Sequence, residues 1–162
     1  MMRSKGGGEA SAGLLDLRAF IPYRLAVLAE AVSRLMGEVY SDRFQLTRNE
    51  WRVLAALDSL SHATQTEVAE YSTLDKMQVS RAIAALDERG LIARSAGRAD
   101  RRTKLLVLTQ QGRALFETIV PLVLEQQRLL LKDLAADERD ALDRALDALL
   151  ERARRLQTRS AV

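Results

Sequence analysis

Residues 64–108 decide the fold, and they read TQTEVAEYSTLDKMQVSRAIAALDERGLIARSAGRADRRTKLLVL. The opening Thr64-Gln65-Thr66-Glu67 has the spacing of a capping box, which predicts a short helix that runs to about Tyr71. After a three-residue connection, Asp75 is a favourable N-cap for a second helix over 76–89. Two short helices joined by such a turn are typical of a helix-turn-helix unit.

The hydrophobic period changes after Gly90, which is placed to end the second helix. Residues 91–95 and 104–108 read as two short strands, and they are the only β signal in the chain. The residues between them form a charged, turn-forming loop. Together with the two helices, this hairpin predicts a winged helix-turn-helix lobe.

The second helix of this unit has one apolar face and one polar face. Placing Val79, Ile83 and Leu86 inward turns a set of other side chains outward: Lys76, Met77, Gln78, Ser80, Arg81 and Ala84. A helix of this kind fits the DNA major groove, where arginine pairs with guanine, glutamine with adenine and serine with a base edge or phosphate. We expect Met77 to lie near a thymine methyl group if it is exposed, and to be core if it is not.

The flanks of this unit predict long helices. Apolar residues recur at helical spacing from Leu17 to Val39, with a break or a helix start expected at Pro22. A second capping box at 47–50 predicts a helix over 48–59, and Thr109 caps a further long helix. A final helix restarts at 137–140.

We therefore expect a mainly α chain with a small β-hairpin wing, in four parts. Residues 1–13 form a tail, 46–114 form the DNA-binding lobe, and 14–45 with 115–162 form a helical dimerisation region. Two long amphipathic helices at opposite chain ends cannot easily both pack on one small lobe. An intertwined homodimer is the interpretation we favour over an intramolecular core, and it would place two half-sites about 34 Å apart.

Composition excludes several classes of protein. The chain has 162 residues, no cysteine and one histidine, so we expect no disulfide, no thiol chemistry and no ordinary zinc site or cofactor. No apolar run reaches the length of a membrane helix, and no signal-type segment follows Met1, so we expect a cytoplasmic protein without a membrane partner. An enzyme is disfavoured, because neither a nucleophile elbow nor a phosphate loop is present.

Charge is concentrated in the middle of the chain. The whole chain has a net charge of +3, but residues 72–113 hold nine bases against four acids, a net charge of +5. Four of these bases lie within residues 98–104, in the loop between the predicted strands and at the start of the second strand: Arg98, Arg101, Arg102 and Lys104. A basic loop beside a helix-turn-helix favours double-stranded DNA as the partner.

The segments 75–92 and 100–112 resemble the recognition helix and the wing of MarR-family transcriptional regulators, and residues 46–54 are similar to the family's second helix. The resemblance covers about residues 20–155. It implies that Asp100 braces the wing while Arg98, Arg101 and Arg102 contact the minor groove or phosphate. A narrow minor groove attracts arginine, which agrees with this expectation.

The segment 20–25 resembles, more weakly, family members that control aromatic-acid catabolism, including nicotinate-pathway repressors. The resemblance implies a small aromatic carboxylate effector, bound between the dimer helices and the lobe. Our candidates for its site are Arg18, Tyr23, Trp51 and His62. An arginine would pair with the carboxylate and the aromatic rings would stack on the ligand, although Trp51 also fits a core position.

The predicted function is therefore a homodimeric repressor that such an effector releases from DNA. The alternative is a DNA-architectural protein of the same fold that senses nothing. A regulator should prefer its palindrome by orders of magnitude, whereas an architectural protein should not.

Overall fold

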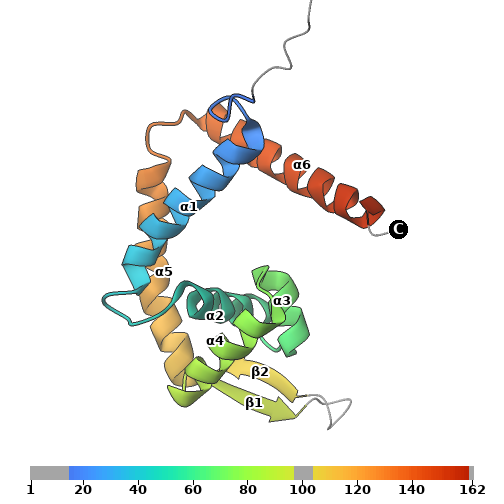
Figure 1. The fold of residues 1–162 in the computed structure, drawn as a ribbon. Helices are drawn as coiled ribbons and strands as arrows, with labels where there is room; N and C mark the ends of the chain where they lie inside the picture. Colours follow the sequence, from blue (N-terminus) through green and yellow to red (C-terminus); the bar gives the residue numbers. More distant parts are fainter. Residues whose placement is uncertain (1–14, 97–103, 161–162) are drawn as a thin grey trace, which may run out of the picture.

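The computed structural model describes residues 15–96 and 104–160, and within them the chain forms six helices and one antiparallel hairpin (Figure 1). The elements are α1 (Ile21–Tyr40), α2 (Arg48–Leu60), α3 (Gln65–Ser72), α4 (Lys76–Glu88), β1 (Ile92–Ala96), β2 (Lys104–Leu108), α5 (Gln110–Leu130) and α6 (Ala136–Ser160). This mostly helical architecture with a small hairpin confirms the predicted fold class. None of the described helices is both long enough and apolar enough to cross a membrane.

Helix starts follow the local capping chemistry of the sequence. The Thr47 and Thr64 hydroxyl oxygens each accept a hydrogen bond from the backbone N–H three residues on, and the Glu50 and Glu67 carboxylates accept one from the backbone N–H of the cap residue. Such a box satisfies two backbone N–H groups that a helix start would otherwise leave unpaired. Pro22 lies in the first turn of α1, so the helix begins there and not at Leu17.

The buried core joins α2, α3 and α4 to the hairpin. Three α4 side chains, Val79, Ile83 and Leu86, are almost fully buried, as predicted. Each such side chain contributes about 1.5–3 kcal/mol relative to an exposed one. They fix which face of α4 remains outside, and the lower part of Figure 1 shows α4 and the hairpin at the same end of the molecule.

The hairpin differs slightly from the predicted one. β1 begins at Ile92, one residue later than predicted, and pairs with β2 from Ile92↔Leu108 to Ala96↔Lys104. The Leu91 carbonyl is instead used by the start of α5, because it accepts a hydrogen bond from the Thr109 N–H at 3.1 Å. The other edge of β2 pairs with Ala63 through Leu106.

The terminal helices bury little of their apolar surface within the chain. All but two of the large exposed apolar side chains lie outside α2–α4, and every described side chain from Ala136 to Arg159 is exposed. Helices α1 and α5 pack on each other, and α6 projects from the end of the molecule remote from the hairpin (Figure 1). The structure therefore consists of a well-packed lobe and an arm of helices with open apolar faces.

Candidate nucleic-acid interface

Helix α4 presents its polar face to solvent. Asp75 caps the helix by accepting a hydrogen bond from the Gln78 N–H at 2.8 Å. The outward set predicted from the sequence is exposed in full: Lys76, Met77, Gln78, Ser80, Arg81 and Ala84. Met77 is 62% exposed, which excludes the core alternative for this side chain in the single chain. The first two turns of α4 can therefore contact base edges without repacking.

Several central bases are already occupied within the chain. The Arg89 guanidinium donates to the carbonyls of Phe44 and Gln45 at 3.0 and 2.8 Å. Arg94 pairs with Asp87 at 3.4 Å and Arg113 with Asp58 at 3.5 Å. These three arginines have partners within the lobe and are therefore less available to an external anion.

Lys76 and Arg81 are exposed and form no ion pair in the part of the chain that the structure describes. Lys104, the first residue of β2, is likewise exposed and forms no ion pair among the described residues. An unpaired exposed cation gains most from a phosphate, because it gives up no internal partner. The available positive charge thus lies on α4 and at the hairpin.

Gln78 has a second role that limits how it can read DNA. Its Oε1 accepts a hydrogen bond from the Asp75 N–H at 3.1 Å and completes the capping box of α4. A bidentate contact with adenine requires both the amide oxygen and the amide nitrogen. While the box is closed, one of the two acceptor sites of the Gln78 Oε1 is occupied, and the amide nitrogen remains available as a donor.

The remaining predicted DNA contacts lie outside the described residues. Arg98, Asp100, Arg101 and Arg102 all fall within 97–103. Their roles stay predictions. The described strands β1 and β2 place both ends of this loop at the tip of the hairpin.

A hollow of about 350 Å³ lies between α1 and α2. Two arginines, Arg48 and Arg52, and two aromatic residues, Tyr40 and Trp51, line this hollow. The other lining residues are Ala29, Val32, Ser33 and Met36. Burial lowers the pKa of Arg52 from its usual value, and the neighbouring charge of Arg48 lowers it further. Both effects show a partly desolvated site with two positive charges, which a carboxylate would stabilise.

Trp51 belongs both to the core and to this hollow. Its ring stacks between Tyr40 and Phe116, with centroid distances of 5.6 and 5.2 Å. The side chain remains partly exposed, and it packs against the buried core. Burial raises the pKa of Tyr40, while Arg48 and Arg52 act in the opposite direction. The Trp51 ring, which lines the hollow, is therefore held in place by its stacking on Tyr40 and Phe116.

The single chain does not bring the four predicted effector residues together. Trp51 lines the hollow, whereas Arg18 and Tyr23 are exposed near the start of α1, and His62 is exposed after α2. Arg48 and Arg52 were missed by the sequence reasoning. Their spacing of four residues, with Trp51 between them, places all three on one side of α2, and this was the available signal.

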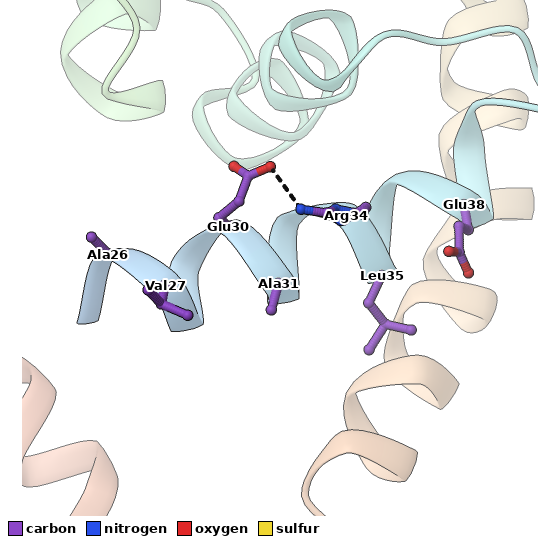
Figure 2. Close-up of a pocket in the computed structure, with 7 residues that line it drawn as sticks. All are labelled: Ala26, Val27, Glu30, Ala31, Arg34, Leu35 and Glu38. Atoms are coloured by element: carbon purple, nitrogen blue, oxygen red, sulfur yellow. Dashed lines mark ion pairs between the residues drawn. The ribbon is translucent and has the colours of Figure 1, made fainter. Parts of the chain in front are cut away.

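Another hollow, of about 570 Å³, is a different kind of surface. Figure 2 shows that all seven of its labelled residues come from α1, among them the ion pair between Glu30 and Arg34 at 3.5 Å. A surface lined by one helix alone has no opposite wall to enclose a small molecule. It is better suited to contact another helix.

Comparisons with known proteins point to one family. A profile of the MarR family matches residues 44–103. YwoH, an uncharacterized HTH-type transcriptional regulator of Bacillus subtilis, is 31% identical over 108 residues, which is 67% of this chain and 78% of YwoH.

Solved structures agree with this similarity. The chain is similar to BpsR of Bordetella bronchiseptica, with 27% identity, a TM-score of 0.76, and coverage of 85% of this chain and 97% of BpsR. That structure concerns regulation of DNA binding by 6-hydroxynicotinic acid. A MarR/EmrR family regulator from Acinetobacter gives 25% identity and a TM-score of 0.80, over 87% of this chain and 99% of the other.

Proposed function

The chain belongs to the MarR family and is a DNA-binding transcriptional regulator, not an enzyme, and from this premise we propose that it is a homodimeric repressor released from DNA by a small aromatic acid. The single observation that carries the DNA-binding part is the outward face of α4, with Lys76 and Arg81 exposed and unpaired within the described chain. Such a regulator acts where the DNA is, in the cytoplasm.

The dimer is supported by the open apolar faces of the terminal helices. Leu149 and Leu150 on α6 are about half exposed, as are Ile21 and Leu28 on α1. Large apolar surfaces of this kind on soluble proteins mark interaction sites. A two-fold dimer would present two α4 helices to the half-sites of a pseudo-palindrome, about 34 Å apart.

We propose that α4 reads base edges and that the wing adds contacts in the minor groove or to phosphate. The residues in this role are Lys76, Gln78, Ser80 and Arg81 on α4, with Arg98, Asp100, Arg101 and Arg102 in the wing. Arginine pairs with guanine in the major groove, whereas a phosphate contact carries little sequence information.

This division of roles predicts that substitutions on α4 and in the wing weaken DNA binding in two different ways. An operator recovered by in vitro selection serves as the probe, with fluorescence anisotropy as the measurement. We expect Arg81→Ala to lower operator affinity by about tenfold or more and to reduce discrimination against a scrambled site. We expect Arg102→Ala to weaken both DNAs by similar factors and to reduce the salt slope by about one unit.

A matched control uses an arginine far from α4. Arg144 is exposed on α6, so Arg144→Ala should leave operator affinity unchanged. If Arg81→Ala and Arg102→Ala both bind as tightly as the unaltered chain, α4 and the wing do not dock as proposed.

For the effector we propose a small aromatic or heteroaromatic acid, with the hollow between α1 and α2 as its site. Arg48 and Arg52 would pair with the carboxylate, and Trp51 would contact the ring. The similarity to BpsR supports a nicotinate-type compound as the first probe. Arg18, Tyr23 and His62 stay predictions, and the second chain of a dimer is the source from which Arg18 and Tyr23 could reach the hollow.

The probe is 6-hydroxynicotinic acid, and the chain has its own reporter for it. Trp51 is the single tryptophan and lines the hollow, so binding should change its fluorescence. We expect saturable quenching together with release of the operator at the same concentrations. The ligand-independent architectural alternative predicts neither effect, and it also predicts similar affinity for the selected operator and a scrambled DNA.

A further inference from the structure

Arg52 contacts two functional parts of the molecule at once. It lines the hollow between α1 and α2, and its Nη1 donates to the Ser72 carbonyl at 3.4 Å and to the Thr73 hydroxyl at 3.5 Å. Ser72 is the last residue of α3, and Thr73 begins the connection to α4. No other residue that lines this hollow is hydrogen-bonded to that turn among the residues the structure describes.

The turn that Arg52 contacts has a backbone conformation that needs support. Thr73 adopts the left-handed region, with φ 54° and ψ 32°, which is unfavourable for a residue with a side chain. The Ser72 carbonyl accepts a hydrogen bond from the Thr73 hydroxyl at 2.7 Å, in addition to the one from Arg52. These contacts stabilise the turn and thereby the angle at which α4 leaves it.

The charge in the hollow bears on the same guanidinium. Arg48 and Arg52 lie on adjacent turns of α2, so their charges repel, and burial and Arg48 together lower the pKa of Arg52. A carboxylate in the hollow would offer Arg52 a charged, bidentate acceptor in place of two long contacts with neutral acceptors. The guanidinium therefore has two competing partners, one in the hollow and one at the turn.

We propose that Arg52 is the positioning residue that couples the effector site to α4: an anion in the hollow draws the guanidinium away from Ser72 and Thr73, and the turn before α4 loses its support. This rests on the proposed function for the site and its ligand class. The coupling is a difference in anion affinity between the two arrangements of Arg52. Arg48 binds the same anion without contacting the turn, so it affects ligand affinity and not the coupling.

The first arm of the test needs no ligand. Operator affinity is measured by anisotropy for Arg52→Ala, Thr73→Gly and the double variant, with Arg48→Ala as the matched control. We expect Arg52→Ala to lose about tenfold in operator affinity, the size of one charge-assisted hydrogen bond, and Arg48→Ala less than threefold. Glycine adopts the left-handed region freely, so Arg52→Ala should cost less in the Thr73→Gly background.

Two controls separate positioning from direct contact and from unfolding. The salt slope of operator binding should be unchanged in Arg52→Ala, since Arg52 is not proposed to contact phosphate. If Arg52→Ala has a markedly lower melting temperature, Arg52→Lys replaces it, because lysine keeps the charge. Its operator affinity and salt slope then test whether residue 52 positions the turn or contacts phosphate. The proposal is overturned if Arg52→Ala and Arg48→Ala lose equally, if the double variant is additive, or if the salt slope falls by about one unit.

The second arm adds 6-hydroxynicotinic acid, followed by Trp51 fluorescence and by operator release. In Arg52→Lys we expect quenching at saturation with little release, and in Arg48→Ala weaker binding with full release at saturation. Full release from saturated Arg52→Lys would overturn the coupling role. Absence of quenching in the unaltered chain would overturn the effector class of the proposed function, and the ligand-free arm would then decide the role of Arg52 by itself.

Discussion

Gly112 lies where the first turn of α5 passes the Leu91 carbonyl. A Cβ at this position would be 1.9 Å from that oxygen and 2.8 Å from its carbon, which is backbone and cannot rotate away. Gly37, inside α1, has open space around it, with the Tyr40 hydroxyl oxygen 4.0 Å away as the nearest atom. The backbone therefore excludes a Cβ at Gly112 and leaves room for one at Gly37.

We expect opposite effects from the same substitution at these two sites. Gly112→Ala should destabilise the chain by about 3 kcal/mol or more, because the backbone of Leu91 must move. Gly37→Ala should stabilise it by about 0.5–1 kcal/mol, the usual gain of alanine within a helix. Urea unfolding at equal protein concentration measures both. Equal stabilities would show that α5 does not pass Leu91 this closely.

Gln78 provides a second prediction at the scale of one residue. Glutamate completes a capping box as well as glutamine does, and its charge is favourable at a helix N-terminus. Gln78→Glu should leave the melting temperature unchanged or higher, yet it removes the free amide donor and adds a negative charge facing DNA. We expect operator affinity to fall at least about tenfold.

The matched control for Gln78→Glu is the same change at the start of another helix. Gln111 is exposed in the first turn of α5, so Gln111→Glu should affect operator affinity much less. If Gln78→Glu binds the operator normally, Gln78 serves only the cap of α4.

At the scale of elements, the capping box of α3 couples helix stability to pH. Hydrogen bonds from the Thr64 backbone and hydroxyl lower the pKa of Glu67 below its ordinary value of 4.5. The folded chain therefore keeps Glu67 ionised at a pH where the unfolded chain binds a proton. This contribution is fully present above the ordinary glutamate pKa, and it is lost as the pH falls through the folded value.

We expect Glu67→Gln to lower the melting temperature at pH 7 and to have a smaller effect as the pH is lowered toward 3. Glutamine does not titrate, so the difference from the unaltered chain follows Glu67 alone. Circular dichroism melts at equal protein concentration measure it, with Glu70→Gln as an exposed control on the same helix. A difference that stays constant with pH would contradict the assignment.

Features that depend on local chemistry were predictable from the sequence. The helix starts at α2, α3, α4 and α5 follow from caps within three residues, and the inward face of α4 follows from apolar spacing. The shift of β1 to Ile92 was not predictable, because it depends on the contact of Leu91 with Thr109, far along the chain.

The hollow between α1 and α2 could not be predicted in the same way. Its position depends on how two helices pack, and the contact from Arg52 to Ser72 spans 20 residues. The sequence reasoning named Trp51 because the family resemblance implies an aromatic effector on which its ring would stack, whereas its place on the apolar stripe favoured the core. It overlooked Arg48 and Arg52, because arginines at the edge of such a stripe usually lie in solvent.

At the scale of the whole molecule, the open faces of α1 and α6 are the surfaces on which the proposed dimer depends. Leu149 is 48% exposed on the apolar side of α6, whereas Arg144 lies on the opposite side. If α6 packs against a second copy, a charge at position 149 would be buried in the interface at high cost.

We expect Leu149→Glu to give monomers and Arg144→Glu to leave the dimer intact, as measured by sedimentation equilibrium. Operator affinity of Leu149→Glu should fall by about two orders of magnitude or more, because a monomer reaches one half-site only. A monomeric unaltered chain, or a dimer that survives Leu149→Glu, would contradict the arrangement.

Helix α5 connects the hairpin end of the molecule to α6, so a tilt at one of its ends displaces the other. Its N-cap Thr109 is tied to Leu91 beside the hairpin, and its other end carries α6. A helix of 21 residues is about 31 Å long, so a tilt of roughly 6° at one end displaces the other by about 3 Å. That displacement is close to the rise of about 3.4 Å per base pair. A small rotation among the terminal helices would therefore be enough to move the hairpin out of register with the groove that we propose it contacts.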